Sequence, residues 1–209
     1  MLYAITDSQL MAGPQLLIKS EAALKGGCRW IQYRDKSRDK SRDKSGDKIR
    51  RLQEASALKD LCDNYNAKLI INDDLELALA VNAHGLHLGQ RDGSLACARA
   101  ALGSDAILGS TCHAQLDLAQ QALNEGASYV AFGRFFISNT KPNAQPAPLA
   151  LLGHAKKLGV PIIAIGGITL ANARSVIDAG ATAIAVCHSL FACDDVETQA
   201  RDFCRFIDA

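Results

Sequence analysis

The sequence predicts a single α/β domain that spans residues 1–209 and folds as a closed (β/α)8 TIM barrel. Three observations support this fold class. Short apolar runs rich in β-branched residues recur along the chain, segments with helical spacing separate them, and the length matches the roughly 200 to 250 residues that such a barrel takes. The expected strands lie at 2–6, 30–33, 68–72, 85–88, 106–109, 129–133, 161–166 and 183–187.

The segments between these runs have the pattern of helices that end in glycine. Leu116, Ala119 and Leu123 recur at the spacing of one helix face, and glycines close the stretches at 21–27 and 176–181. An open doubly wound sheet is the alternative arrangement, but no G-x-G-x-x-G motif follows the first expected strand. Strands that are apolar almost throughout favour the barrel, because its strands are buried on both faces.

A charged repeat follows the second expected strand, where the letters R-D-K-S occur three times in succession from Arg34. Only the first copy adjoins a buried strand. The later copies, at 38–41 and 42–45, would stack like charges at i and i+4 in a helix, and no apolar residue anchors them. We therefore expect an insertion at about 37–47 that forms a mobile loop, and we expect function only in the first copy.

Composition and charge exclude several classes of protein. The chain has 23 basic and 22 acidic residues, so it lacks the charge excess of a general nucleic-acid or acidic-membrane binder. Its apolar runs are shorter than a membrane-spanning helix requires, and its N-terminal residues do not resemble a signal peptide. Seven scattered cysteines without a C-x-x-C pair are typical of reduced thiols. We expect a cytoplasmic protein.

Polar residues follow the expected strands directly, which is where the active site of a barrel lies. After the second strand, the alternation of an extended chain places Gln32, Arg34 and Lys36 on one side, with Tyr33 and Asp35 on the other. A guanidinium and an ammonium that point together suit a phosphate or pyrophosphate. The alternative is that both cations only pair with acidic neighbours at the surface.

Two carboxylates from adjacent strand ends indicate a site for a hard cation. Asp73 follows the third expected strand and Asp92 follows the fourth, so both are expected at the barrel mouth. Mg²⁺ is commonly held by few protein oxygens, with water and substrate phosphate completing its shell. The alternative is that Asp73 or Asp74 only caps the helix that follows.

Later strand ends add groups that suit a second anion. The S-N-T-K segment at 138–141 lies among prolines and is long enough to close as a lid over a bound anion. Gly167 and His188 follow the seventh and eighth strands, where barrels often bind phosphate through backbone amides. We therefore expect two anionic groups at one mouth, one held by Arg34, Lys36, Lys141 and a metal, and the other by backbone amides near Gly167 and His188. A transfer to a phosphorylated acceptor with pyrophosphate as the leaving group would use both.

The histidines divide into two pairs. His84 and His87 fall on opposite faces of an extended strand, so we interpret them as structural and not as a metal pair. His113 and His188 lie at the ends of the fifth and eighth strands and are better candidates for ligand contact, although a lone histidine is more often a hydrogen-bonded filler.

In this order, the segments LYAITD, QYRDK, IINDD, LHLGQRD, the T-K-P loop, AIGGIT and AGA-x-x-IAV resemble the thiamine phosphate synthase family over essentially the whole chain. The resemblance implies a (β/α)8 barrel that joins hydroxymethylpyrimidine diphosphate to a thiazole phosphate, or its carboxythiazole form, with Mg²⁺ as cofactor. The products would be thiamine monophosphate and pyrophosphate, formed by a dissociative route through a pyrimidine cation.

Carried over residue by residue, the resemblance assigns three groups of positions. Asp73 and Asp92 would hold Mg²⁺, and Arg34, Lys36, Lys141 and Thr111 would act in catalysis. The expected substrate-binding residues are Gln32, Tyr33, Arg34, Asp35, Lys36, Asn72, Thr111, Ser138, Asn139, Thr140, Lys141, Gly167, Cys187 and His188.

The chain departs from the family pattern at three places. Thr111 stands where the family usually has serine, so its extra methyl group must fit beside the pyrimidine. Ser138 replaces the first threonine of the T-x-T-K loop. Cys187 and His188 replace a common Ile-Ser pair, which affects the side-chain contact but not the backbone amides.

Two other functions remain open from the sequence. A thiazole tautomerase on the related barrel would use a histidine such as His113, but it should lack the pyrophosphate-binding cations and the metal carboxylates. A non-catalytic barrel that binds a phosphorylated ligand would need no metal pair. The expected partners are small molecules, without nucleic acid or membrane, and the sequence leaves open whether the protein is a homo-oligomer.

Overall fold

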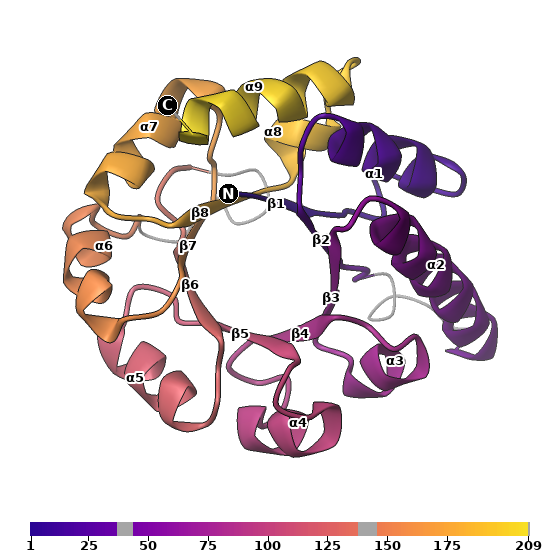
Figure 1. Ribbon diagram of the computed structural model, residues 1–209, viewed down its shortest axis with the longest axis horizontal. Helices are drawn as coiled ribbons and strands as arrows, with labels where there is room; N and C mark the ends of the chain where they lie inside the picture. The colour runs from indigo at the N-terminus through magenta and orange to yellow at the C-terminus, as the bar shows by residue number, and fades with distance from the viewer. Residues whose placement is uncertain (37–43, 138–145, 209) are drawn as a thin grey trace.

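Eight parallel strands close into a barrel in chain order, so β8 pairs with β1 (Figure 1). This computed structural model describes residues 1–36, 44–137 and 146–208. It confirms the predicted TIM barrel and excludes the open sheet. The strands are β1 (Leu2–Ile5), β2 (Trp30–Tyr33), β3 (Lys68–Asn72), β4 (Gly85–Leu88), β5 (Ile107–Thr111), β6 (Tyr129–Gly133), β7 (Ile162–Ile165) and β8 (Ala183–Val186).

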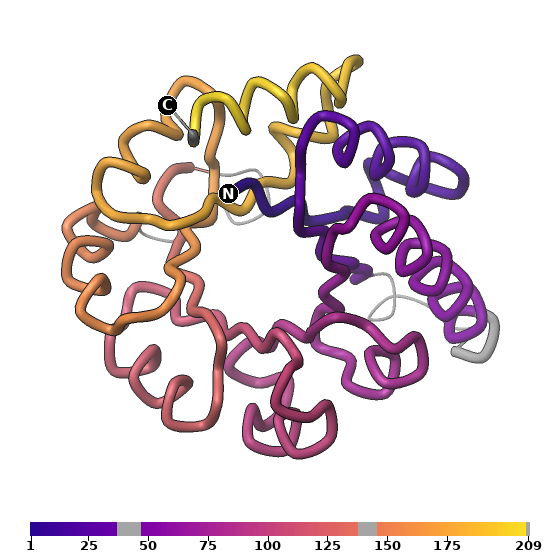
Figure 2. Tube along the Cα trace, viewed as in Figure 1, coloured from indigo at the N-terminus to yellow at the C-terminus, as the bar shows by residue number. Residues whose placement is uncertain are grey.

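Helices surround the barrel as an outer ring (Figure 1). The last of them, α9, packs beside α1, so the end of the chain covers its beginning (Figure 2). The helices are α1 (Gln15–Lys25), α2 (Lys44–Asn64), α3 (Leu75–Ala80), α4 (Leu95–Leu102), α5 (Leu116–Asn124), α6 (Ala150–Ala155), the 3-10 turn η2 (Lys156–Leu158), α7 (Leu170–Ala179), α8 (His188–Phe191) and α9 (Val196–Asp208).

The last residues of the expected insertion at 37–47 are helical. α2 begins at Lys44, so the last part of the expected loop at 37–47 is the first turn of a helix. Asp47 explains part of this difference, because its carboxylate accepts a hydrogen bond from Arg50 one turn later, at 2.5 Å. The remaining repeat residues, 37–43, lie outside the described residues, as do 138–145.

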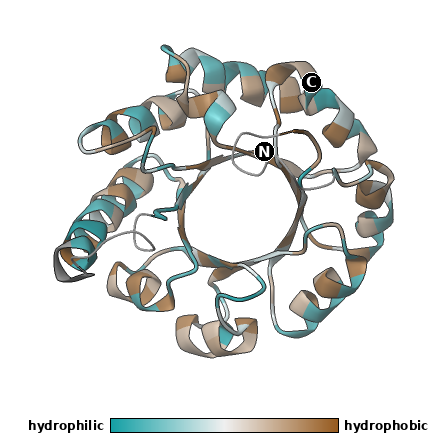
Figure 3. Ribbon diagram, turned by 180° about the vertical axis from the view of Figure 1, so that it is seen from behind, coloured by the Kyte–Doolittle hydropathy of each residue, from teal (hydrophilic) through white to brown (hydrophobic). Residues whose placement is uncertain are grey.

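Two apolar layers hold the barrel together. One lies between the strands and the helices, where Leu24, Leu58 and Phe203 are almost completely buried. The other fills the inside of the barrel and includes Tyr3 and Tyr129. Figure 3 shows the strands as predominantly hydrophobic, with hydrophilic residues on the helices. Within the described ranges, no helix has the length and apolar character needed to cross a membrane.

The parallel register brings the expected site residues to one end of the barrel. Gln32 of β2 pairs with Ile70 of β3, and Asn72 of β3 pairs with His87 of β4. Thr111 is the last residue of β5. Because the carboxyl ends of parallel strands share one mouth, the polar segments that follow β2, β3, β4 and β5 are neighbours there.

Candidate active site

Side chains at the end of β2 alternate between the barrel interior and the helix layer, as predicted. Gln32 is buried, and its amide nitrogen donates a hydrogen bond to the Tyr3 hydroxyl at 2.7 Å. Tyr33 and Asp35 point to the other side, where both bond to side chains of α2. Both side chains thus face the helix layer, as the alternation of the strand predicts, and substrate binding at these two positions stays a prediction.

Arg50 of α2 organises this outer side of the strand end. Its guanidinium donates hydrogen bonds to Asp35 and Asp47, both at 2.5 Å, and to Glu54 at 2.7 Å. Glu54 also accepts a 2.6 Å hydrogen bond from the Tyr33 hydroxyl. Sequence reasoning missed this cluster. The Arg50–Glu54 spacing was visible, but it indicates only a surface pair within one helix.

Thr6, directly after β1, fixes the backbone of Arg34. The Arg34 amide donates to the Thr6 hydroxyl at 2.9 Å, and that hydroxyl lies 3.4 Å from the Arg34 carbonyl oxygen. Thr6 is 1% exposed, so water does not compete for these bonds. Thr6 was also missed from the sequence, where it is only the last residue of an apolar run.

Asp73 lies at the mouth, where its carboxylate contacts Lys36 and Asn72. Lys36 Nζ is 2.5 Å from Asp73 Oδ2, and Asn72 Nδ2 donates to the same oxygen at 2.6 Å. The Asp73 backbone has a φ of 63°, in the left-handed region that non-glycine residues rarely adopt. This conformation turns the chain between β3 and α3 and gives Asp73 a direction different from that of Asp74.

Asp74 is the residue that caps α3, which resolves one of the open alternatives. Its carboxylate accepts the Leu77 amide at 3.0 Å, the usual role of an N-cap aspartate. The same carboxylate accepts a 2.9 Å hydrogen bond from the buried Arg51 of α2. Because Asp74 serves the helix, the capping alternative does not apply to Asp73.

Asp92 completes the acidic part of the mouth. Desolvation, and next the neighbouring Asp73 carboxylate, raise the pKa of Asp92. Its carboxylate packs directly against Gly89, since a Cβ on that glycine would lie 2.3 Å from Asp92 Oδ2. Repulsion between two close carboxylates is what a divalent cation relieves, so the pair fits Mg²⁺. The described part of the chain contains no cluster of three or more such ligands, and a cation here would need water or substrate oxygens.

His87 lies inside the barrel and reaches Thr111. Its Nε2 is 2.8 Å from Thr111 Oγ1, and its Nδ1 is 2.9 Å from the Tyr129 hydroxyl. Burial lowers the pKa of His87 to about 4. His84 points outward, accepting the Leu69 amide and lying 3.2 Å from a carboxylate of α2. The two histidines therefore occupy opposite faces, as predicted, but His87 contacts a predicted site residue.

The seventh and eighth strand ends are built from glycines and a short helix. Gly167 has a φ of 67°, and a Cβ there would approach the carbonyl oxygen of Ile137 to 2.4 Å. Only glycine therefore allows the segment after β6 to lie so close. Cys187 is half-buried, and burial raises the pKa of its thiol to about 12. His188 and His113 are both exposed.

The predicted loop residues at 138–141 cannot be placed at this mouth. Ser138, Asn139, Thr140 and Lys141 lie outside the described residues. The stems of their loop are defined, since Phe136 donates its amide to Gly166 at 3.0 Å and Ala147 donates to Arg134 at 2.7 Å. The stem before the loop therefore lies beside the end of β7, and the stem after it lies beside the end of β6.

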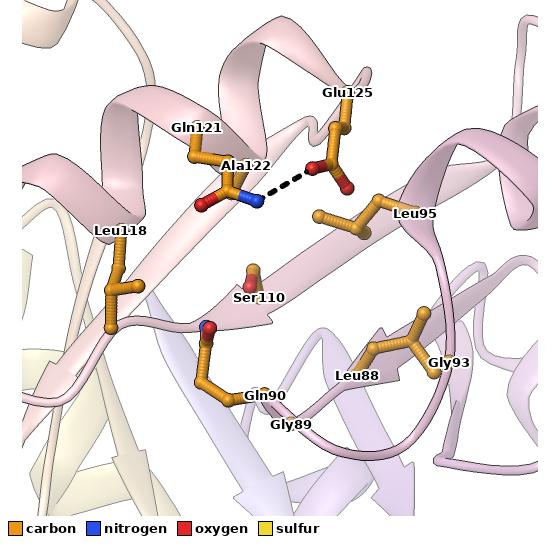
Figure 4. Close-up of a pocket in the computed structure, with 10 residues that line it drawn as sticks. All are labelled: Leu88, Gly89, Gln90, Gly93, Leu95, Ser110, Leu118, Gln121, Ala122 and Glu125. Carbon is orange, nitrogen blue, oxygen red and sulfur yellow. Dashed lines mark hydrogen bonds between the residues drawn. The ribbon is translucent and has the colours of Figure 1, made fainter.

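A small cavity of about 90 Å³ lies between the ends of β4 and β5 and the helices α4 and α5 (Figure 4). Ser110 and Gln90 line it, together with residues of α4 and α5. Gln90 also donates a 2.6 Å hydrogen bond to the Thr111 carbonyl oxygen. Ser110 thus faces the helix layer while Thr111 faces the interior, which supports Thr111 as the hydroxyl of the β5 end.

Comparisons with known proteins point to one family. Residues 2–190 match the family model described as thiamine monophosphate synthase. The chain is 57% identical over 201 residues to a thiamine-phosphate synthase of Saccharophagus degradans, covering 95% of this chain and 89% of that protein. A solved thiamine phosphate pyrophosphorylase from Pyrococcus furiosus has a TM-score of 0.84 at 27% identity, covering 99% of this chain and 95% of that one.

More distant structures share the fold alone. A 3-hexulose-6-phosphate synthase matches with a TM-score of 0.71 at 16% identity, covering 99% of both chains. At this level of identity, the likeness shows a barrel of the same topology and carries no information about substrate.

Proposed function

We propose that this chain, which belongs to the thiamine monophosphate synthase family, is a transferase that joins a pyrimidine diphosphate to a thiazole phosphate. The pyrimidine substrate would be 4-amino-2-methyl-5-hydroxymethylpyrimidine diphosphate. The acceptor would be 4-methyl-5-(2-hydroxyethyl)thiazole phosphate or its carboxylated form. The products would be thiamine monophosphate and pyrophosphate.

The convergence of cations and carboxylates at one mouth carries this proposal. Lys36 from β2 meets Asp73 from β3 at 2.5 Å, and Asp92 from the β4 end is close enough to Asp73 for their charges to interact. A diphosphate needs cations around its oxygens, and a departing pyrophosphate needs its charge neutralised. The site has a lysine that can bind phosphate oxygens and a pair of carboxylates that can hold a metal ion. A tautomerase needs neither of them.

The pyrimidine diphosphate is proposed to lie over the β2 to β5 side of the mouth. Gln32, Asn72 and Thr111 would contact the pyrimidine ring, while Arg34 and Lys36 bind the diphosphate. Lys141 would bind the pyrophosphate from the loop after β6, while Ser138 and Thr140 of the same loop, with Asn139 between them, would line the thiazole-phosphate side. Backbone amides at Gly167, Cys187 and His188 would bind the thiazole phosphate on the opposite side.

Asp73 and Asp92 are the proposed Mg²⁺ ligands. Their paired carboxylate oxygens are the ligand type that Mg²⁺ prefers, and their mutual repulsion disfavours the pair without a cation. Mg²⁺ bound there would neutralise charge on the pyrophosphate oxygens. Lys36, which shares Asp73, would then bind a diphosphate oxygen from the adjacent side.

The proposed reaction is a dissociative substitution. The bond between the pyrimidine methylene and the diphosphate oxygen breaks, and pyrophosphate leaves with the electron pair. The aminopyrimidine ring stabilises the resulting cation, and the thiazole nitrogen donates its lone pair to form the new C–N bond. No protein nucleophile is required, and the thiol of Cys187, with its pKa raised by burial, stays protonated at neutral pH. The protein orients the substrates and binds the leaving group.

Incubation of the purified protein with both substrates tests the proposal. We expect thiamine monophosphate and pyrophosphate in equal amounts, formed with Mg²⁺ and not with excess chelator. Isomerisation of a thiazole phosphate without the pyrimidine substrate would instead identify a tautomerase. Binding of either substrate without turnover would identify a non-catalytic barrel.

A further inference from the structure

A continuous chain of hydrogen bonds crosses the inside of the barrel beneath the proposed site. Gln32 Nε2 lies 2.7 Å from the Tyr3 hydroxyl, which lies 3.0 Å from the Tyr129 hydroxyl. That hydroxyl lies 2.9 Å from His87 Nδ1, and His87 Nε2 lies 2.8 Å from Thr111 Oγ1. The chain therefore begins and ends at residues proposed to contact the pyrimidine, and three residues between them have no other assigned role.

We infer that every hydrogen bond in this network donates in the same direction, from Gln32 toward Thr111. Tyr3, Tyr129 and His87 are then positioning residues that make Thr111 a hydrogen-bond donor to the pyrimidine substrate. The inference rests on the proposed function, because it concerns the same site. It adds the polarity of the site, which determines which pyrimidines the site accepts.

The direction starts at Gln32. Its amide nitrogen is only a donor, so the Tyr3 oxygen accepts and the Tyr3 hydrogen must point elsewhere. The other partner of the Tyr3 hydroxyl in this chain is Tyr129, which therefore accepts. The Tyr129 hydrogen is then directed at Nδ1 of His87.

The imidazole passes this direction to Thr111. A ring nitrogen that accepts a hydrogen bond carries no hydrogen, so the hydrogen of neutral His87 is on Nε2. Nε2 then donates to Thr111 Oγ1. The Thr111 oxygen is thus an acceptor within the chain, and its own hydrogen is left for a partner at the mouth, where Thr111 is partly exposed.

Burial and ring packing hold these hydrogen-bonded side chains in place. Tyr3 and Tyr129 are at most 1% exposed, so a hydroxyl turned the wrong way would leave a buried polar group unpaired. The Tyr129 ring packs edge-on against Trp30 at 5.3 Å between centroids and stacks on His87 at 5.6 Å. Gln90 holds the Thr111 backbone through a 2.6 Å hydrogen bond to its carbonyl oxygen.

The two ends of the chain present a defined pattern to a ligand. Thr111 supplies a donor, and Gln32, whose amide nitrogen is engaged with Tyr3, supplies its carboxamide oxygen as an acceptor. A 4-aminopyrimidine carries the complementary pair, since its amino group donates and its adjacent ring nitrogen accepts. A 4-oxopyrimidine carries the reverse pair and should be rejected.

The tautomer of His87 tests the direction of the hydrogen bonds without any activity measurement. Nitrogen-15 NMR of the full chain, with the His87 signals assigned by comparison with His87→Gln, should show hydrogen on Nε2 and none on Nδ1. Hydrogen on Nδ1 would mean that the chain runs the other way, with Thr111 as donor to His87, and would overturn the inference.

A double-mutant cycle tests whether Tyr129 acts through Thr111. Tyr129→Phe should raise the KM for the pyrimidine diphosphate about tenfold, the scale of one lost hydrogen bond, and leave the KM for the thiazole phosphate within about twofold. In a Thr111→Val background the same change should have no further effect. Additive effects, or equal effects on both KM values, would indicate a merely structural role and overturn the inference.

Two further variants make the cycle decisive. Tyr65→Phe is the matched control, because Tyr65 donates to Glu21 at the outer surface and should leave both KM values unchanged. If Tyr129→Phe does not fold, Tyr3→Phe breaks the same chain one link earlier, and the same cycle applies. Absence of product from the wild-type protein would contradict the proposed function instead, and the NMR result would still stand by itself.

Discussion

The two apolar layers of this barrel differ in what they contain. The layer between strands and helices is made of side chains such as Leu58 and Phe203, which have no polar atoms and are completely buried. The layer inside the barrel includes Tyr3, Tyr129 and His87, whose polar atoms are paired with one another. Of the two layers, the interior one connects directly to the mouth through Gln32 and Thr111.

This difference indicates a division of roles between the two faces of the same strands. Apolar packing tolerates many side chains of similar volume, so the outer layer mainly stabilises the fold. Buried hydroxyl and imidazole groups must be paired, so the interior fixes a specific arrangement of donors and acceptors. The following predictions test this division, in order of decreasing expected effect.

Truncation in the outer layer should reduce stability and leave activity intact. Phe203→Ala removes a completely buried ring of α9, and we expect it to lower the free energy of unfolding by about 3–5 kcal/mol. Denaturant unfolding measures this change. Turnover per folded molecule should stay within about twofold, because α9 lies on the outer ring. A large loss of turnover in the folded variant would contradict the division of roles.

Acid should destabilise the protein through the interior layer. The pKa of His87 is lowered from an ordinary 6.5 to about 4, so the unfolded chain binds this proton more readily than the folded one. Stability from this group is present above pH 6.5 and is lost as pH falls toward 4, by on the order of 3 kcal/mol. Thermal unfolding in metal-free buffer measures the effect. If His87→Gln keeps the same dependence between pH 4.5 and 7, the assignment to His87 is wrong.

Removal of charge at the mouth should reduce turnover with little effect on stability. Asp73→Asn should lower turnover by about 10² or more, the scale for a preorganised electrostatic contact. Steady-state kinetics with and without added Mg²⁺ measure it. Asp63→Asn is a matched control, since Asp63 pairs with Lys59 at 2.6 Å on α2. Equal losses in the two variants would show that a general charge effect, and not the mouth, is responsible.

Loss of the Arg50 cluster on the outer side of β2 should have an intermediate effect on turnover. Arg50→Met removes the hydrogen bonds to Asp35, Asp47 and Glu54 and leaves the Asp35 carboxylate buried without this partner. We expect turnover to fall about tenfold, because the backbone that carries Arg34 and Lys36 loses its support. Steady-state turnover at saturating pyrimidine diphosphate measures this loss. Arg174→Met, which removes a partly exposed arginine of α7 far from β2, is the control.

The later copies of the charged repeat should matter least. Deletion of residues 37–44 restores the sequence QYRDKSGDK, and we expect turnover within about threefold of the wild type, because loop length has a small energetic effect. Arg34→Ala, in contrast, should lower turnover by about 10². A deletion as damaging as Arg34→Ala would show that the first copy alone does not carry the function.

The sequence by itself determined the fold and the end of the barrel at which the candidate site residues meet. Strand and helix periods are local properties, and eight repeats of them predict a barrel whose polar strand ends share one mouth. The same period placed Gln32, Arg34 and Lys36 opposite Tyr33 and Asp35. Asp73 and Asp92 were predicted at the same end of the barrel because each follows a strand in the sequence.

Only the tertiary structure decided which side chains are partners. Tyr3 and Tyr129 are 126 residues apart in sequence, and their contact depends on the closure and stagger of the barrel. The bonds from Arg50 to Asp35 and Glu54 depend on how α2 packs over β2, and the left-handed turn at Asp73 leads into the Asp74 cap of α3. Periodicity assigns a residue to a face, but partners across a closed barrel are fixed only when all eight strands are in register.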